Sequence, residues 1–152
     1  MDWFNMQVSC VASYAIVKRM EKIGAVELPA TGYSMFPLIK QGDICRFVSC
    51  NTENLKKGDI ALFYTASGQL IAHRFYQTIT HQDKVQYLFK GDTNIRFDEP
   101  IDKEQIIGEL VTIQKKRIII DMNSRMIPIW NQIVYVPVMS RLLRKYIRLV
   151  KA

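Results

Sequence analysis

The stretch from residue 25 to residue 121 constrains the fold more than any other part of the chain. It is a series of short segments rich in Val, Ile, Leu, Phe and Tyr, separated by Gly, Asp, Asn and Ser. Such segments, bounded by turn residues, are typical of β-strands. They predict a mostly β fold of the α+β class. The expected strands are 26–28, 44–48, 60–64, 69–80, 85–90, 106–114 and 117–121.

The turns between these segments indicate how neighbouring strands pair. Ala66, Ser67 and Gly68 predict a hairpin that joins the strands at 60–64 and 69–80. The polar run at 81–84 predicts a second hairpin, and Lys115-Lys116 is the expected connection between the last two strands.

Helical patterns flank this β body on both sides. Residues 5–24 carry apolar side chains at intervals of three and four, and Gly24 is placed to end the helix. This helix either packs on the core or lies on a partner or a membrane. Residues 138–150 predict a second helix that is basic and amphipathic. We expect one compact domain with three parts: an N-terminal helix (1–24), a β domain (25–121) and a C-terminal extension (122–152).

Length and composition favour a folded globular chain whose positive charge is unevenly placed. The chain has 152 residues, of which 49% are apolar and 23% are charged. The net charge is +7, and no acidic residue follows Asp121. The basic residues beyond that point are Arg125, Arg141, Arg144, Lys145, Arg148 and Lys151.

Cysteine and histidine usage argues against a disulfide framework and against zinc. The three cysteines, Cys10, Cys45 and Cys50, include no C-x-x-C pair, and the chain has only two histidines. An odd number of widely spaced cysteines favours a reducing compartment. We therefore expect no metal and no other cofactor.

The sequence also lacks the patterns that direct a chain into or across a membrane. No window reaches the ~18 apolar residues that a membrane span requires. The N-terminus lacks the basic start of a secretory signal. The expected location is cytoplasmic.

Ser34 stands at the centre of a motif that suits a nucleophile. Gly32 allows a sharp backbone turn before it, and Pro37 prevents a regular helix after it. Gly42 and Asp43 then mark a turn before the next strand. A serine in a rigid, non-helical turn can face a cleft, although an arbitrary serine is more often a polar loop residue.

Three further blocks follow the serine block in a fixed order. They are Gly58-Asp59, His73-Arg74 and Lys90-Gly91-Asp92-Thr93-Asn94, with Asp98 shortly after. Together the four blocks resemble those of the clan that contains signal peptidase I and the LexA-type self-cleaving repressors. The resemblance covers roughly residues 30–110. It implies a β-rich peptidase body and a peptide or precursor protein as substrate.

The resemblance also implies a role for each polar residue of the blocks. Ser34 would be the nucleophile of a serine endopeptidase, and His73 would be its general base, as in relatives of the endoplasmic-reticulum type. Two aspartates are candidates for the carboxylate that orients the histidine. Asp98 matches the triad acid, and Asp92 also matches a family position but could instead shape the turn. Arg74 either braces the site by pairing with Asp92 or forms a solvated ion pair. Two other aspartates, Asp43 and Asp59, are expected to cap turns.

Two positions depart from the family pattern and motivate a second hypothesis. Many signal peptidases carry a hydroxyl side chain where this chain has Gly32, and a glycine where it has Tyr33. The oxyanion would then depend on the Ser34 backbone N–H and a further donor. The alternative is a catalytically weak or inactive relative that binds peptides or a partner.

A third hypothesis is a DNA-binding regulator of the repressor type. It is motivated by the clan and by the positive charge. Only about 30 residues precede Ser34, which is too few for a helix-turn-helix domain. The basic residues also lie on a helix whose other side is apolar, so we expect no specific nucleic-acid partner.

The basic helix at 138–150 has two interpretations. Its apolar side, which includes Leu142, Leu143 and Leu149, either packs on the protein or rests on an anionic membrane surface. In the second case Trp130 and Tyr135 would lie at the interface, and the protein would be peripheral at the inner membrane surface.

Overall fold

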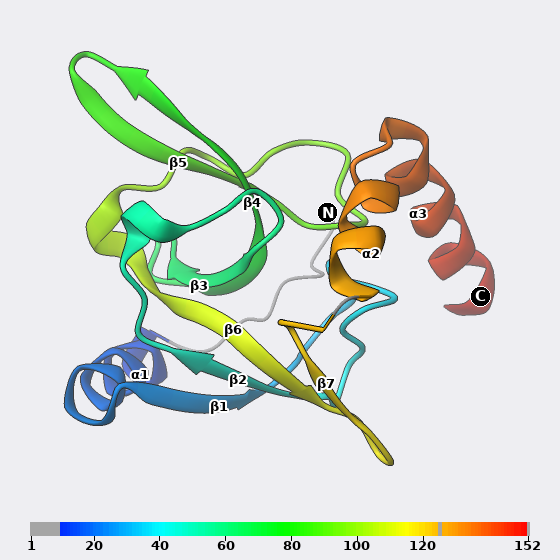
Figure 1. The fold of residues 1–152 in the computed structure, drawn as a ribbon, viewed down its shortest axis with the longest axis horizontal. Coiled ribbons are helices and arrows are strands. Elements are labelled where there is room, and N and C mark those ends of the chain that lie inside the picture. The colour runs from blue at the N-terminus through cyan, green and yellow to red at the C-terminus, as the bar shows by residue number, and fades with distance from the viewer. Residues whose placement is uncertain (1–9, 125, 152) are drawn as a thin grey trace.

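The computed structural model describes residues 10–124 and 126–151 of the chain. Within these residues the strands form one antiparallel sheet in the order β1-β2-β6-β3-β4-β5, with β7 paired to β6 (Figure 1). The expected mostly β fold of the α+β class is confirmed. The strands are β1 (Ala25–Pro29), β2 (Ile44–Val48), β3 (Ile60–Tyr64), β4 (Leu70–His81), β5 (Lys84–Lys90), β6 (Ile106–Gln114) and β7 (Ile119–Asp121).

Both expected hairpins are present, and the β4–β5 turn is tighter than the sequence suggested. The β3–β4 turn closes where the Thr65 N–H donates to the Gln69 carbonyl at 2.9 Å. In the β4–β5 hairpin only Gln82 and Asp83 lie outside the strands, and their φ angles of 48° and 61° are left-handed. Two-residue hairpin turns commonly require such angles, and aspartate adopts them more readily than most residues. The connection before β7 is longer than Lys115-Lys116 alone, because β7 begins only at Ile119.

Helix α1 (Cys10–Ile23) packs on the sheet, as the first of the two interpretations predicted. Its Met20 is buried in the core, and its Ser13 hydroxyl donates to the Gly68 carbonyl at 3.0 Å. The helix ends at Gly24, whose N–H donates to the Met20 carbonyl. Residues 5–9 of the expected helix lie outside the described residues.

The core lies on both faces of the central strands. Successive residues of a strand point to opposite faces, so β3 contributes Ile60 and Leu62 to one apolar cluster, and Ala61 and Phe63 to another. Strand β4 divides its residues in the same way. The strands that carry His73 and its neighbours are therefore enclosed on both faces, which fixes the positions of their side chains.

Two aspartates cap turns as expected. Asp43 accepts a hydrogen bond from the Lys40 N–H at 2.8 Å, and Asp59 accepts one from the Lys56 N–H at 2.7 Å. Asp43 also contacts the amino group of Lys115. Two short 3-10 turns, η1 (Thr52–Asn54) and η2 (Lys103–Gln105), complete the connections.

The expectation of one C-terminal helix was wrong, because two helices follow the sheet. Helix α3 (Pro137–Lys151) covers the predicted segment, and helix α2 (Met126–Val134) precedes it. Helix α2 was not predicted from the sequence, because Pro128 interrupts the helical pattern of its apolar residues. Pro128 lies in the first turn, where the backbone N–H groups have no partner within the helix and a proline is tolerated.

Figure 1 shows β7, α2 and α3 gathered at one end of the molecule, with α1 and the β4–β5 hairpin toward the other. No helix in the described part of the chain is long and apolar enough to cross a membrane.

The aromatic cluster between β3, β4 and β5 should carry much of the stability. Phe89 is fully buried, with its ring centre 4.6 Å from that of Phe63 and 5.6 Å from that of Phe75. We expect Phe89→Ala to lower the free energy of unfolding by about 3–5 kcal/mol. The matched control is Phe97→Ala, because Phe97 is 49% exposed. Its expected cost is about 1 kcal/mol or less. Chemical denaturation measures both, and equal losses would contradict this assignment of the core.

Candidate active site

Ser34 is held in the connection between β1 and β2 by contacts on both sides. The neighbouring Met35 and Ile39 are buried in the core and anchor the turn. The Ser34 carbonyl accepts a hydrogen bond from the Thr93 N–H at 3.0 Å, and the Thr93 hydroxyl donates to the Tyr33 carbonyl at 3.2 Å. Ser34 itself is only 5% exposed. The turn is therefore fixed to the segment that follows β5.

His73 and Asp98 are in direct contact. The Nδ1 atom of His73 lies 2.6 Å from Oδ2 of Asp98. The histidine is fully buried, whereas the Asp98 side chain is 18% exposed. Asp98 is held in place because its N–H donates to the Phe89 carbonyl at 2.9 Å. A carboxylate at Nδ1 favours the tautomer with the proton on that nitrogen, which leaves Nε2 as an acceptor.

The second ring nitrogen of His73 has no hydrogen-bond partner among the described residues. Buried polar atoms are nearly always paired, so an unpaired one points to a function. Gly91 keeps the space beside this nitrogen open: a Cβ atom at position 91 would lie 3.0 Å from Nε2 and 2.8 Å from the amide nitrogen of Asn94. Any larger residue at position 91 would crowd the imidazole.

The turn that follows β5 joins the surroundings of Ser34 to those of His73. Gly91 lies beside the imidazole, and Thr93, two residues later, binds the Ser34 backbone. Ser34 also lines a small cavity together with Ala72, which precedes His73 on β4. The Ser34 hydroxyl makes no hydrogen bond to the His73 ring in this arrangement. The pairing of nucleophile and base therefore stays a prediction.

Arg74 and Asp92 form a buried ion pair, so the interpretation as a solvated pair was wrong. The Nε and Nη2 atoms of Arg74 donate to the two carboxylate oxygens of Asp92, each at 2.8 Å. The exposed fractions of the two side chains are 0% and 1%. Burial alone would lower the pKa of Arg74, but the adjacent Asp92 outweighs it and raises the pKa. The two aspartates thus separate: Asp98 contacts His73, and Asp92 contacts Arg74.

Arg74 also binds the C-terminal extension, a contact that sequence reasoning missed. Its Nη1 atom donates to the Gly58 carbonyl at 2.8 Å and to the side-chain oxygen of Asn131 on α2. Gly58 leaves room for Asn131, since a Cβ atom there would lie 2.3 Å from its amide nitrogen. The Tyr135 hydroxyl adds a hydrogen bond to the Phe75 carbonyl at 3.3 Å. No motif marks Asn131, so no sequence signal indicated this contact.

Gly32, the supporting residue expected near the oxyanion, lies in the same small cavity as Ser34 and has a positive φ of 86°. A side chain at this position would be strained, so the backbone favours glycine here.

The two thiols that the structure describes fully are poor nucleophiles. Burial raises the pKa of Cys45 to about 12 and that of Cys50 to about 11. Both therefore stay protonated near neutral pH, and a thiol reacts as its thiolate.

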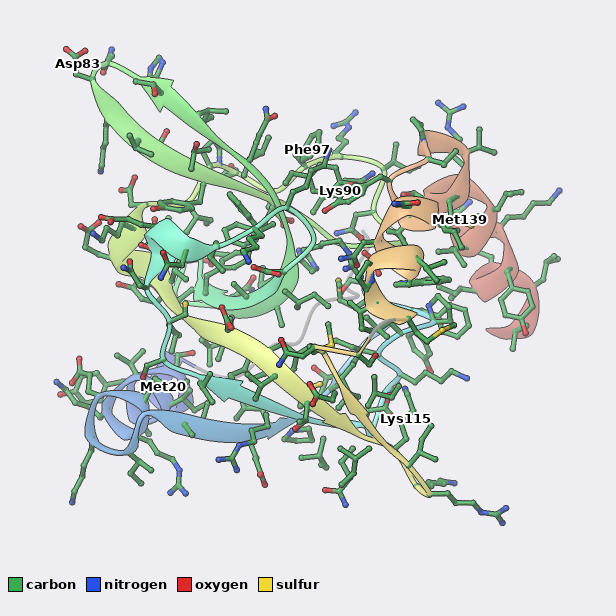
Figure 2. All side chains as sticks on the ribbon, in the orientation of Figure 1. Met20, Asp83, Lys90, Phe97, Lys115 and Met139 are labelled. Carbon is green, nitrogen blue, oxygen red and sulfur yellow. The ribbon has the colours of Figure 1, made fainter. Side chains whose placement is uncertain are left out.

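Lys90 is directed toward α3 and an aromatic pair. Figure 2 shows Lys90 beside Phe97, and its amino group lies 5.8 Å from the ring centres of both Phe97 and Tyr76. The amino group also donates to the Ser140 hydroxyl on α3 at 3.3 Å. Burial lowers the pKa of Lys90. The lysine thus connects β5 with the C-terminal extension.

The sequence matches no model of a known protein family, and no characterised protein shows significant similarity to it.

The Arg74–Asp92 pair should be a major stabilising element. Arg74→Met leaves a buried carboxylate without its partner, so we expect a loss of about 3–5 kcal/mol in the free energy of unfolding. The control is Arg46→Met, which breaks the exposed contact between Arg46 and Glu27 at 3.1 Å and should cost about 0–1 kcal/mol. Urea denaturation measures both losses. Similar small losses for the two variants would contradict a structural role for Arg74.

Proposed function

We propose that the protein is a serine endopeptidase with Ser34 as nucleophile, His73 as general base and Asp98 as the residue that orients the base. The observation that carries this proposal is the state of the His73 ring. It is fully buried, hydrogen-bonded to a carboxylate through Nδ1, and without a partner at Nε2 in the described part of the chain. A histidine with a purely structural role would be expected to use both nitrogens.

In this proposal the reaction proceeds by transfer of an acyl group to Ser34. Nε2 of His73 accepts the Ser34 hydroxyl proton while the oxygen attacks the peptide carbonyl carbon. The same nitrogen then gives the proton to the leaving amine, and the peptide C–N bond breaks. Water, deprotonated by His73, next hydrolyses the acyl–serine ester and releases the second product. Hydrogen bonds of this kind often tighten only when substrate binds.

In this proposal an extended peptide binds at the unpaired side of residues 70–73 of β4, which are at most 4% exposed in the structure. Pairing of β4 with β5 begins at Arg74, opposite Lys90, whereas residues 70–73 pair with β3 on one side only among the described residues. An extended substrate can add to such an edge by backbone hydrogen bonds. The cavity beside Ser34 is small and is lined in part by Ala30 and Ala72. It favours a substrate with a small side chain next to the scissile bond.

A fluorophosphonate probe tests whether Ser34 is activated. We expect the wild-type protein to be labelled, and Ser34→Ala and His73→Ala to lose labelling by about 100-fold or more, because the hydroxyl reacts only when a base takes its proton. Ser67→Ala, which changes a serine in the exposed β3–β4 turn, serves as the matched control and should be labelled like the wild type. Mass spectrometry locates the adduct.

If the wild-type protein is not labelled, or Ser34→Ala is labelled equally, the peptidase proposal fails. The same sheet edge would then serve to bind peptides without cleaving them.

The two aspartates should respond differently to loss of charge. Asp98→Asn removes the carboxylate at Nδ1, so we expect the labelling rate to fall about 100-fold or more with little change in melting temperature, since Asp98 is partly exposed. Asp92→Asn weakens the buried pair with Arg74, so its main effect should be a lower melting temperature. Thermal denaturation and labelling rates, measured on both variants below their melting temperatures, distinguish these effects. The reverse pattern would assign the orienting role to Asp92.

A further inference from the structure

Most of the large apolar side chains that are exposed in the described residues lie after residue 117, although this part is a small fraction of the chain. Three elements carry them. Ile118 and Ile119 lie at the β6–β7 turn and are 59% and 68% exposed. The other exposed apolar side chains of this part lie mostly on α2 and on α3. Scattered apolar residues are normal on a protein surface, but a concentration in one region marks a contact surface.

These three elements lie at the same end of the molecule (Figure 1). A groove of about 670 Å³ runs between β7, α2 and the residues that follow Ser34. Its walls include Ile119, Ile129, Ile133 and Leu38. Ile129 and Ile133 are also among the exposed residues of α2. The groove therefore extends the apolar surface from the β6–β7 turn to α2.

Helix α3 docks on the protein through one side and leaves another side exposed. Ser140 and Ile147 are 2% and 8% exposed, and the ring of Tyr146 stacks on that of Phe36 with their centres 5.8 Å apart. By contrast, Leu142 and Leu149 are 55% and 70% exposed. The two interpretations of this helix from sequence are therefore compatible, because different residues serve docking and the exposed stripe.

Basic residues border this apolar surface. Lys116 and Arg117 lie at the β6–β7 turn, and Arg141, Lys145 and Arg148 lie on exposed positions of α3. The sequence has no acidic residue after Asp121. Apolar side chains bordered by basic ones match the interfacial region of an anionic bilayer, where the apolar groups enter the acyl boundary and the cations meet phosphate.

We propose that the C-terminal surface, formed by the β6–β7 turn, α2 and α3, binds the surface of an anionic lipid bilayer. A second copy of the chain is a poorer occupant, because it would bring an equal set of positive charges against the same surface. This proposal does not rest on peptidase activity, since none of the residues that form the surface is placed in the catalytic mechanism.

Co-sedimentation with vesicles tests the proposal. We expect the full chain to bind vesicles that contain phosphatidylglycerol and phosphatidylcholine, and to bind pure phosphatidylcholine at least ~10-fold more weakly. Raising the salt concentration to about 0.5 M should weaken binding by a similar factor. Ser34→Ala should bind like the wild type, so that the outcome is independent of the peptidase proposal. Binding that is absent at low salt, or equal on neutral vesicles, would overturn the proposal.

Paired substitutions test which residues form the surface. Leu142→Ser/Leu149→Ser and Ile129→Ser/Ile133→Ser should each weaken vesicle binding by about 10-fold or more with little change in melting temperature, because these side chains are exposed. Val85→Ser is the matched control, because Val85 is 50% exposed and lies near Asp83 at the tip of the β4–β5 hairpin, at the opposite end (Figure 2). It should bind like the wild type.

Two further outcomes would also overturn the proposal. The first is unchanged vesicle binding by one of the two double variants. The leucine variant would then exclude α3 from the surface, and the isoleucine variant would exclude α2. The other is a dimer, detected by light scattering without lipid, that the Leu142→Ser/Leu149→Ser variant no longer forms while vesicles are not bound. That result would assign the surface to self-association.

Discussion

The structure around the candidate site depends on the burial of one charge, the guanidinium of Arg74. A charge removed from water must find partners, and Arg74 finds them in three separate segments of the chain. Asp92 follows β5, Gly58 precedes β3, and Asn131 belongs to α2. Because His73 is the preceding residue on β4, these contacts also fix the strand position from which the imidazole projects. The position of the imidazole therefore depends on contacts that are not themselves part of the proposed chemistry.

His73 and Arg74, which are adjacent on β4, therefore make separate sets of contacts. Side chains of successive strand residues point to opposite faces, so His73 and Arg74 reach different surroundings from one short stretch of backbone. Each has its own aspartate, and the two aspartates come from the same loop after β5. The loop holds Asp98 against the imidazole, keeps side-chain atoms away from Nε2 at Gly91, and binds the Ser34 backbone through Thr93. A single loop therefore sets three features of the site.

The sequence predicted the elements whose signals are local. The strands followed from short segments rich in apolar residues and bounded by turn residues, and Gly24 marked the end of α1 correctly. Helix α2 was missed, because Pro128 and a nearly continuous apolar run removed the helical periodicity. In the site, the resemblance left Asp98 and Asp92 as candidates to orient His73, and the structure places Asp98 at His73 and pairs Asp92 with Arg74. The contact of Arg74 with Asn131 could not be predicted, because it joins residues 57 positions apart that share no motif.

The two C-terminal helices differ in how they contact the body of the protein. Helix α2 is tied to the buried Arg74–Asp92 pair through Asn131, so its loss would remove one hydrogen-bond partner of the buried guanidinium. Helix α3 meets the body at other places: Tyr146 stacks on Phe36, Ser140 accepts a hydrogen bond from Lys90, and Ile147 is buried. A changed sequence after Val136 would therefore leave the contact between Asn131 and Arg74 in place. Under the membrane-binding proposal, changes in α3 would alter where such a protein resides without any change in the strands that hold His73.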